Sequence, residues 1–183
     1  MNLWFRLAWA LFAWRFRTKR TISDVGIRPF RVWPTDLDVF NHMNNGKFLA
    51  LLDLGRLDLM LRSGSWQALQ KRGWYPVVVA QNITFRKSLR PWQKFSIETR
   101  IVGWDDISAF IEQRFVAEGE IYAKAIVRVR FLKRARGVLA PSEVIEACGG
   151  WNGEQPSLPL WVKNWADASA LPKGREATPS VWN

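Results

Sequence analysis

The sequence predicts an α+β fold in which an antiparallel sheet wraps around one long central helix. The segment from Asn45 to Arg62 is apolar almost all the way round. A helix of that kind in a globular protein must be enclosed by other structure. From Tyr75 to Phe131 the apolar period changes from helical to two, and short connections separate four strands. Short connections are typical of antiparallel neighbours, so these strands are expected to form the sheet that encloses the helix.

The elements are expected in the order strand, long helix, short helix and four strands. A first strand is expected at 25–33, Asn44 or Asn45 caps the long helix, and Gly64 ends it before a short helix at 65–73. The four strands are expected at 76–85, 94–104, 107–117 and 121–131. A sheet of this length can curl around a helix of about 17 residues, roughly 26 Å long. This arrangement is called a hotdog fold.

Side-chain spacing adds detail to the long helix and to the last strand. Asp58 and Arg62 stand four residues apart and Asp53 and Arg56 three, so each couple can form an ion pair. Ala50 and Gly55 are the small positions at which a sheet can come close. In the last strand, alternate residues from Ile121 to Phe131 share an apolar face, and Lys124, Arg128 and Arg130 share the other.

The chain of 183 residues is expected to contain one folded domain with two appendages. Residues 1–22 form an amphipathic, membrane-associated segment, residues 23–150 form the domain, and residues 151–183 form a tail with a short helix within 158–171. The single cysteine, Cys148, excludes an internal disulfide and is interpreted as a core thiol in a reducing compartment. One histidine and scattered carboxylates make a poor ligand set, so no metal site is expected.

A formal net charge of +11 and twelve tryptophans point to an anionic partner. The candidates are nucleic acid, a phospholipid surface and a phosphate-bearing small molecule. Tryptophan favours membrane interfaces or acyl groups, because its ring has an apolar body and a polar tip. Nucleic acid is disfavoured, because the positive charges are split between 15–20 and 124–136 without a recognition motif.

Residues 1–20 carry three of the tryptophans and one basic cluster. Their apolar run of about fourteen residues contains Arg6 and is short for a spanning helix of roughly 20 residues. The basic cluster from Arg15 to Arg20 follows the apolar run, which keeps it on the cytoplasmic side. The segment is therefore expected to lie on the cytoplasmic face of a membrane, with the protein cytoplasmic and peripheral. The alternative is an ordinary helix that packs on the domain or on a second subunit.

The loop before the long helix gathers the residues with catalytic potential. Asp38 can activate water or attack as a nucleophile, and His42 can orient the water or carry a proton. The helix that begins near Asn45 presents unpaired N–H groups and the positive end of its dipole to a developing oxyanion. The alternative interpretation is structural, with Asp36 and Asp38 as turn and cap residues.

The stretch D-L-D-V-F-N-H-M-N-N-G-K-F, residues 36–48, resembles the D-x-D-x-x-x-H-V-N-N-x-x-Y signature of hotdog-fold acyl thioesterases. That family includes 4-hydroxybenzoyl-CoA thioesterase-like enzymes, bacterial acyl-CoA thioesterases and plant acyl-carrier-protein thioesterases. A second block, V-G-W-D-D with I-E-Q-R-F-V downstream, is similar to the branch of thioesterase superfamily member six. The similarity covers roughly residues 28–148.

The resemblance implies an acyl-CoA or acyl-carrier-protein thioesterase that releases free acid and thiol. It makes Asp38 the base or nucleophile and His42 the catalytic histidine, and it places the N–H groups of Asn45 and Gly46 at the thioester. Asp53 stands near an acidic position common in the family. No separate cofactor is implied, because coenzyme A or phosphopantetheine enters as part of the substrate.

The resemblance also implies a homodimer or higher homo-oligomer, which fits a sheet whose edge strand would otherwise be exposed. Arg86, Lys87 and Arg90 are expected to bind coenzyme A phosphates, usually across such an interface, and the alternative for them is a solvated turn. One departure from the family pattern is Phe40, where the plant enzymes carry asparagine. It favours an alternative function, a non-catalytic acyl-CoA or lipid-binding protein at the membrane surface.

Overall fold

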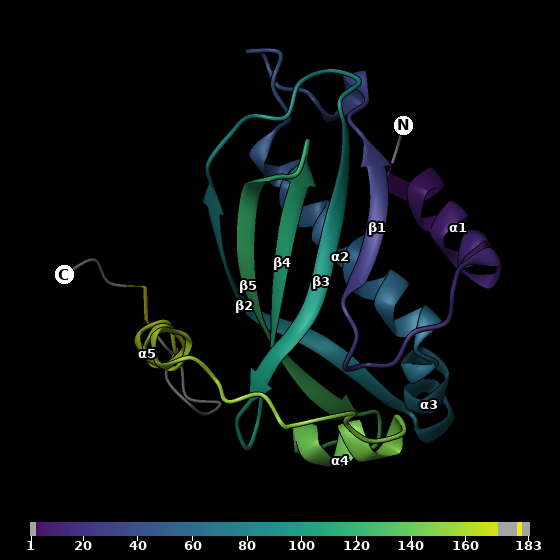
Figure 1. Cartoon of the computed structure of the whole chain (residues 1–183). Coiled ribbons are helices and arrows are strands. Elements are labelled where there is room, and N and C mark those ends of the chain that lie inside the picture. The colour runs from purple at the N-terminus through teal and green to yellow at the C-terminus, as the bar shows by residue number, and fades with distance from the viewer. Residues whose placement is uncertain (1–2, 172–178, 181–183) are drawn as a thin grey trace.

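The computed structural model describes residues 3–171 and 179–180 and contains one curled antiparallel sheet with a long helix against it (Figure 1). The helices are α1 (Leu3–Ala13), α2 (Asn45–Arg62), α3 (Ser65–Arg72), α4 (Pro141–Ala147) and α5 (Leu160–Ala168), with 3-10 turns η1 (Trp14–Phe16) and η2 (Pro34–Asp36). The strands are β1 (Gly26–Arg31), β2 (Trp74–Phe85), β3 (Lys94–Trp104), β4 (Ala109–Ala117), β5 (Glu120–Lys133) and β6 (Val138–Leu139). The predicted α+β class is confirmed.

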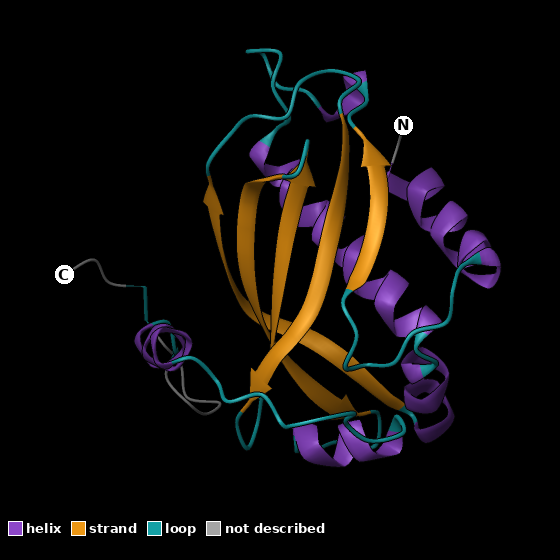
Figure 2. Cartoon of the chain, viewed as in Figure 1, coloured by secondary structure: helices purple, strands orange, loops and turns teal. Residues whose placement is uncertain are grey.

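The sheet has the order β1-β3-β4-β5-β2, with every pair antiparallel and β6 added to β5. Strands β4 and β5 meet at Glu118 and Gly119, which both have positive φ, as a tight two-residue hairpin requires. Helix α2 crosses the concave side of the sheet from end to end (Figure 2). Helix α5 lies within the stretch expected to hold a short helix, whereas residues 172–178 and 181–183 of the expected tail lie outside the described part of the chain.

Helix α2 is buried because its side chains fill the space inside the curled sheet. Asn44 caps its first turn by accepting a hydrogen bond from the Gly46 N–H at 2.8 Å. At Gly55 a β-carbon would come within 2.8 Å of the Ile97 side chain, so the sheet lies against the helix backbone there, as the small residue predicted. The buried apolar side chains of α2 are Phe48, Leu51, Leu52, Leu54, Leu59 and Leu61.

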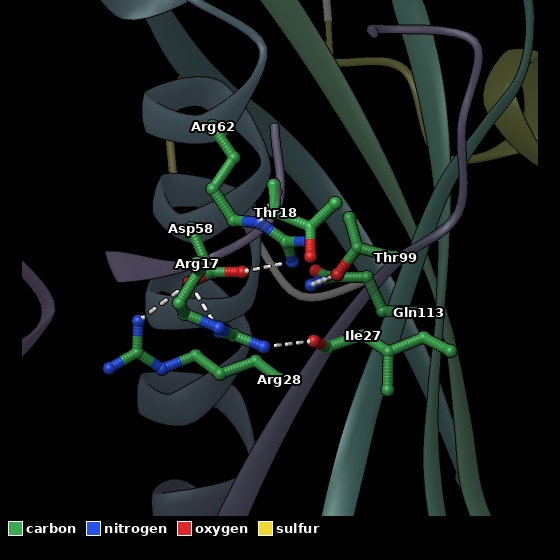
Figure 3. Close-up of polar contacts among 8 residues, drawn as sticks. All are labelled: Arg17, Thr18, Ile27, Arg28, Asp58, Arg62, Thr99 and Gln113. Atoms are coloured by element: carbon green, nitrogen blue, oxygen red, sulfur yellow. Dashed lines mark hydrogen bonds and ion pairs between the residues drawn. The ribbon is translucent and has the colours of Figure 1, made fainter. Parts of the chain in front are cut away.

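Asp58 on α2 is a buried carboxylate that three arginines share (Figure 3). Arg62, one turn further along α2, donates to it at 3.2 Å, and the predicted Asp58–Arg62 pair is thereby confirmed. Arg28 on β1 lies at 3.1 Å and Arg17, just after η1, at 2.7 Å. Arg62 also donates to the Thr18 carbonyl at 2.8 Å. One carboxylate therefore connects α2, the first strand and the N-terminal segment.

Helix α1 packs against the domain with its charged residue inward. Arg6 is 4% exposed and forms an ion pair with the buried Asp36, while Ala10 is fully buried. The aromatic side chains of this segment point outward instead. The exposed ones are Trp4, Phe5, Trp9, Phe12 and Phe16.

The outer face of the sheet is covered where α5 crosses it. Arg128 lies on the face opposite Val127 and Val129, as the alternation predicted. That face is not solvated here, because Arg128 is buried and donates to the Ser108 hydroxyl at 2.9 Å and to the Ala166 carbonyl at 3.1 Å. Helix α5 therefore belongs to the packed structure of the domain.

Replacing Asp58 with asparagine is expected to lower the free energy of unfolding by roughly 3–5 kcal/mol. The change leaves three guanidinium groups around a neutral side chain, and removing one partner of a buried ion pair carries a cost of that size. Urea unfolding followed by tryptophan fluorescence measures it. The control is Asp106→Asn in an exposed turn, for which a change below about 0.5 kcal/mol is expected. Equal effects of the two variants would contradict the role given to Asp58.

Candidate functional site

The loop that precedes α2 fixes the Asp38 carboxylate in place. Its Oδ1 accepts hydrogen bonds from the backbone N–H groups of Phe40 at 2.9 Å and His42 at 3.1 Å. The Asp38 N–H donates in turn to the His42 carbonyl at 2.8 Å, and Asn41 has a φ of 61° inside the turn. Oδ2 of Asp38 makes no hydrogen bond to any residue that the structure describes. One carboxylate oxygen is thus anchored and the other is available.

The two carboxylates of the D-x-D motif have different surroundings. Asp36 is 2% exposed, pairs with Arg6 and accepts a hydrogen bond from the Trp33 N–H at 2.9 Å. These contacts stabilise η2 and hold α1 against the domain. The structural interpretation therefore applies to Asp36, and Asp38 is the carboxylate that remains accessible.

The amino end of α2 offers one unpaired backbone donor beside this loop. The N–H of Gly46 is used inside the cap, where it donates to the Asn44 side chain at 2.8 Å. The N–H of Asn45 has no hydrogen-bond partner among residues 3–171. The helix dipole places partial positive charge at this end. Of the two predicted oxyanion donors, Asn45 is the one left open.

His42 opens onto a surface cavity of about 550 Å³. The Met43 N–H donates to the Leu89 carbonyl at 3.0 Å, which holds the loop against the segment that joins β2 to β3. That segment contributes Lys87 and Arg90 to the cavity wall. The other residues of the wall were not predicted from the sequence, and they are Ser88, Gln93, Glu118 and Tyr122.

Two of the three predicted phosphate-binding residues already have an acidic partner. Arg86 lies at 2.8 Å and Lys87 at 2.6 Å from the Glu120 carboxylate. Hydrogen bonds from Lys87 and Arg86 lower the pKa of Glu120 to about 2. The Arg90 side chain forms no ion pair with the described residues. A phosphate group that binds here therefore meets Arg90 unopposed and competes with Glu120 for the other two.

Asp53 lies at the rim of a separate apolar cavity of about 310 Å³ between α2 and the sheet. Its side chain is 70% exposed and forms the predicted ion pair with Arg56. Cys148 lines the same cavity, and burial raises the pKa of its thiol, which fits the expected core thiol. Most of the wall is aliphatic or aromatic, including Leu57, Leu59, Met60, Val78, Ile111 and Val129.

A buried polar network connects Asp53, through its partner Arg56, to the sheet. Arg56 donates to the Gln113 side chain at 2.6 Å, and Gln113 donates to the Thr99 hydroxyl at 2.9 Å. The role of Gln113 was not predicted from the sequence. The signal was its position in β4, where it shares the inward face with Ile111 and Phe115 although it is polar.

The structure does not bring Asp38 and Asp53 together within one chain. Asn45 and Asp53 are separated by eight residues of helix, or roughly 12 Å, and Asp38 lies before the helix begins. His42 lines the surface cavity with Lys87 and Arg90, while Asp53 lines the apolar one. Among residues 3–171 and 179–180, no three His, Cys, Asp or Glu side chains gather where they could hold a metal ion.

Comparison with known proteins places the chain in a family. A family profile described as the thioesterase-like superfamily matches residues 32–166. Protein THEM6 of Xenopus laevis is 32% identical over 172 residues, which cover 90% of this chain and 80% of that protein. The chain belongs to the thioesterase-like superfamily. The predicted resemblance to hotdog-fold thioesterases and to the branch of superfamily member six is confirmed.

Solved structures agree with this assignment. The probable thioesterase YbaW of Escherichia coli is 25% identical, with a TM-score of 0.63 over 66% of this chain and 94% of that one. The DHNA-CoA thioesterase of Staphylococcus aureus shares the fold with a TM-score of 0.60 at 15% identity, over 81% of this chain and 97% of that one. The family assignment confirms the expectation that this protein is a thioester hydrolase.

Proposed function

We propose that the protein hydrolyses acyl-CoA or acyl-carrier-protein thioesters with Asp38 as base or nucleophile. The observation that supports this most is that an available Asp38 oxygen and the open Asn45 N–H belong to the same loop and helix start. A carboxylate and a backbone donor at a helix amino end can act on opposite sides of a carbonyl group.

The reaction adds one water across the thioester bond. Asp38 removes a proton from water as the water oxygen attacks the carbonyl carbon, or attacks that carbon itself before water releases the acid. The Asn45 N–H and the helix dipole stabilise the charge that develops on the carbonyl oxygen. The C–S bond then breaks, and the departing thiolate takes up the proton. The exposed His42 ring orients the water or carries the proton.

A second copy of the chain is expected to pair along β2. This edge strand has twelve residues, none of them charged, and Tyr75, Val78 and Phe85 are exposed on it. Long apolar edges tend to pair with other chains. The opposite edge, β1, has only six residues, and two of them, Arg28 and Arg31, are charged. The dimer therefore forms through β2.

This dimer would complete the active site. Antiparallel pairing of β2 with its copy reverses the direction of the second α2, so the amino end of one α2 approaches the carboxyl half of the other. Asp38 of one copy then faces the Asp53 cavity of the second. The acyl chain enters that cavity, whose volume lies in the range of roughly 300–1,000 Å³ typical of ligand sites. The carrier phosphates lie along Lys87 and Arg90. No separate cofactor takes part.

Asp38→Asn is expected to lower kcat on acyl-CoA by at least about a hundredfold, because general-base catalysis contributes roughly that much or more. His42→Ala is expected to lower it less, since its ring acts through water. Release of coenzyme A from a chain-length panel of acyl-CoAs measures both, with Asp106→Asn as the charge-matched control. Parental activity in the Asp38 variant would exclude the mechanism. Tight acyl-CoA binding without turnover by the parent would favour the non-catalytic alternative.

We also propose that α1 holds the enzyme at the cytoplasmic face of an anionic membrane. Trp4 is 74% and Phe5 68% exposed, and the basic Arg15 and Lys19 follow on the surface. Aromatic side chains favour the headgroup region, and each basic residue near anionic lipid adds roughly 1 kcal/mol. No described helix is long and apolar enough to cross a bilayer. The segment would therefore lie in the interface.

Replacing both Trp4 and Phe12 with serine is expected to weaken sedimentation with phosphatidylglycerol vesicles at least tenfold. Burying one large apolar side chain contributes roughly 1.5–3 kcal/mol, so two account for more than a decade in affinity. Salt should weaken parental binding without abolishing it. Trp161→Ser on α5, which is 50% exposed, is the matched control. If the double variant binds vesicles as well as the parent but no longer dimerises, the aromatic face of α1 contacts a second copy instead of a membrane.

A further inference from the structure

A further cavity, of about 370 Å³, lies between α1 and β1, and neither Asp38 nor Asp53 lines it. Trp9 and Trp33 contribute two of its walls. No acidic side chain lines it among the described residues. Its cationic lining comes from α1, the residue after η1, β1 and the start of β3, and consists of Arg6, Arg17, Arg28, Arg31 and Lys94.

The positive charge around this cavity is only partly neutralised. Asp36 pairs with Arg6, and Asp58 is shared by Arg17, Arg28 and Arg62. Two carboxylates therefore pair with four arginines. Two further cationic side chains, exposed on β1 and β3, have no acidic partner among the described residues.

That exposed pair is Arg31 and Lys94, which form no ion pair with the described residues. They stand directly opposite each other in the register of β1 and β3. Like charges in directly opposed positions destabilise a sheet. An anion between them would remove that repulsion.

Arg28 is a buried cation in the wall of this cavity. It is 6% exposed, and its Nε, which is fully buried, has no hydrogen-bond partner in the described structure. Burial lowers the pKa of the Arg28 guanidinium from its ordinary value, Asp58 raises it, and the neighbouring Arg17 lowers it. Buried polar groups are nearly always hydrogen-bonded, so this unpartnered donor, like those of Arg20 and Arg130, shows that the protein itself leaves the guanidinium incompletely satisfied.

We propose that this cavity binds a phosphate group. A phosphate carries several acceptor oxygens and up to two negative charges, which suits guanidinium groups that converge from different elements. Trp9 lines the cavity and is also 61% exposed on the outer face of α1, so the group reaches the site from a lipid headgroup or from free solution. The site is separate from Arg86, Lys87 and Arg90, and it does not depend on the hydrolytic mechanism.

The test uses the full chain and the double variant Arg31→Ala/Lys94→Ala, in which both altered side chains are exposed. Sodium phosphate and glycerol 3-phosphate are expected to raise the melting temperature of the parent by several degrees over sodium chloride at equal ionic strength. The double variant should bind glycerol 3-phosphate at least tenfold more weakly by calorimetry. The control is Lys71→Ala/Lys163→Ala, two exposed lysines on α3 and α5, which should bind as the parent does. Lys94→Gln gives a second, milder variant with the same measurements.

A second arm distinguishes the source of the phosphate. Phosphatidylcholine vesicles with and without phosphatidic acid are offered to both double variants. If the soluble phosphates bind and the loss is confined to the Arg31/Lys94 variant, the site takes free phosphate. If only phosphatidic acid vesicles show that loss, the site takes a lipid headgroup. If the Arg31/Lys94 variant matches its control with every probe, the cavity is not a phosphate site.

Discussion

The shared ion pair at Asp58 determines how the rest of the structure is arranged. A carboxylate with three guanidinium groups is stable in the interior only when all four groups are held together. Because Arg17, Arg28 and Arg62 come from the N-terminal segment, β1 and α2, the pair fixes these elements at one point (Figure 3). Helix α2 is thereby held in one orientation along the sheet. The amino end of α2 and its preceding loop, which carries Asp38, follow from that orientation.

The sequence predicted those parts of the fold that depend on local pattern. An all-round apolar helix and alternating strands have little choice of environment, and pairs spaced three or four residues apart on a helix meet by geometry. The contact between Arg6 and Asp36 was not predictable in this way. Thirty residues separate the two, so nothing local shows that the helix turns its one charge inward and its aromatic rings outward.

In the candidate site, too, the local features were predictable from the sequence and the long-range contacts were not. Asp38 and His42 lie in one loop because they are four residues apart in the sequence, so the motif alone predicted that they would be close. The partner of Arg86 and Lys87 is Glu120 at the start of β5, and the residue that supports Asp53 through Arg56 is Gln113 on β4. Such contacts are set by strand register, which one sequence leaves undetermined. The separation of Asp38 from Asp53 follows from the length of α2, and the second copy that we propose would bring these two residues to one site.

The most direct test of a site shared between two copies is subunit complementation. Asp38→Asn and Asp53→Asn proteins are purified separately, mixed, unfolded and refolded together, and assayed for acyl-CoA hydrolysis. If each site needs the Asp38 carboxylate of one copy and the Asp53 carboxylate of the other, both single variants are inactive and every mixed dimer regains one intact site. Half of the dimers are mixed, so the account predicts recovery to about one quarter of the parental activity. A mixture no more active than the average of its two components would contradict the shared site.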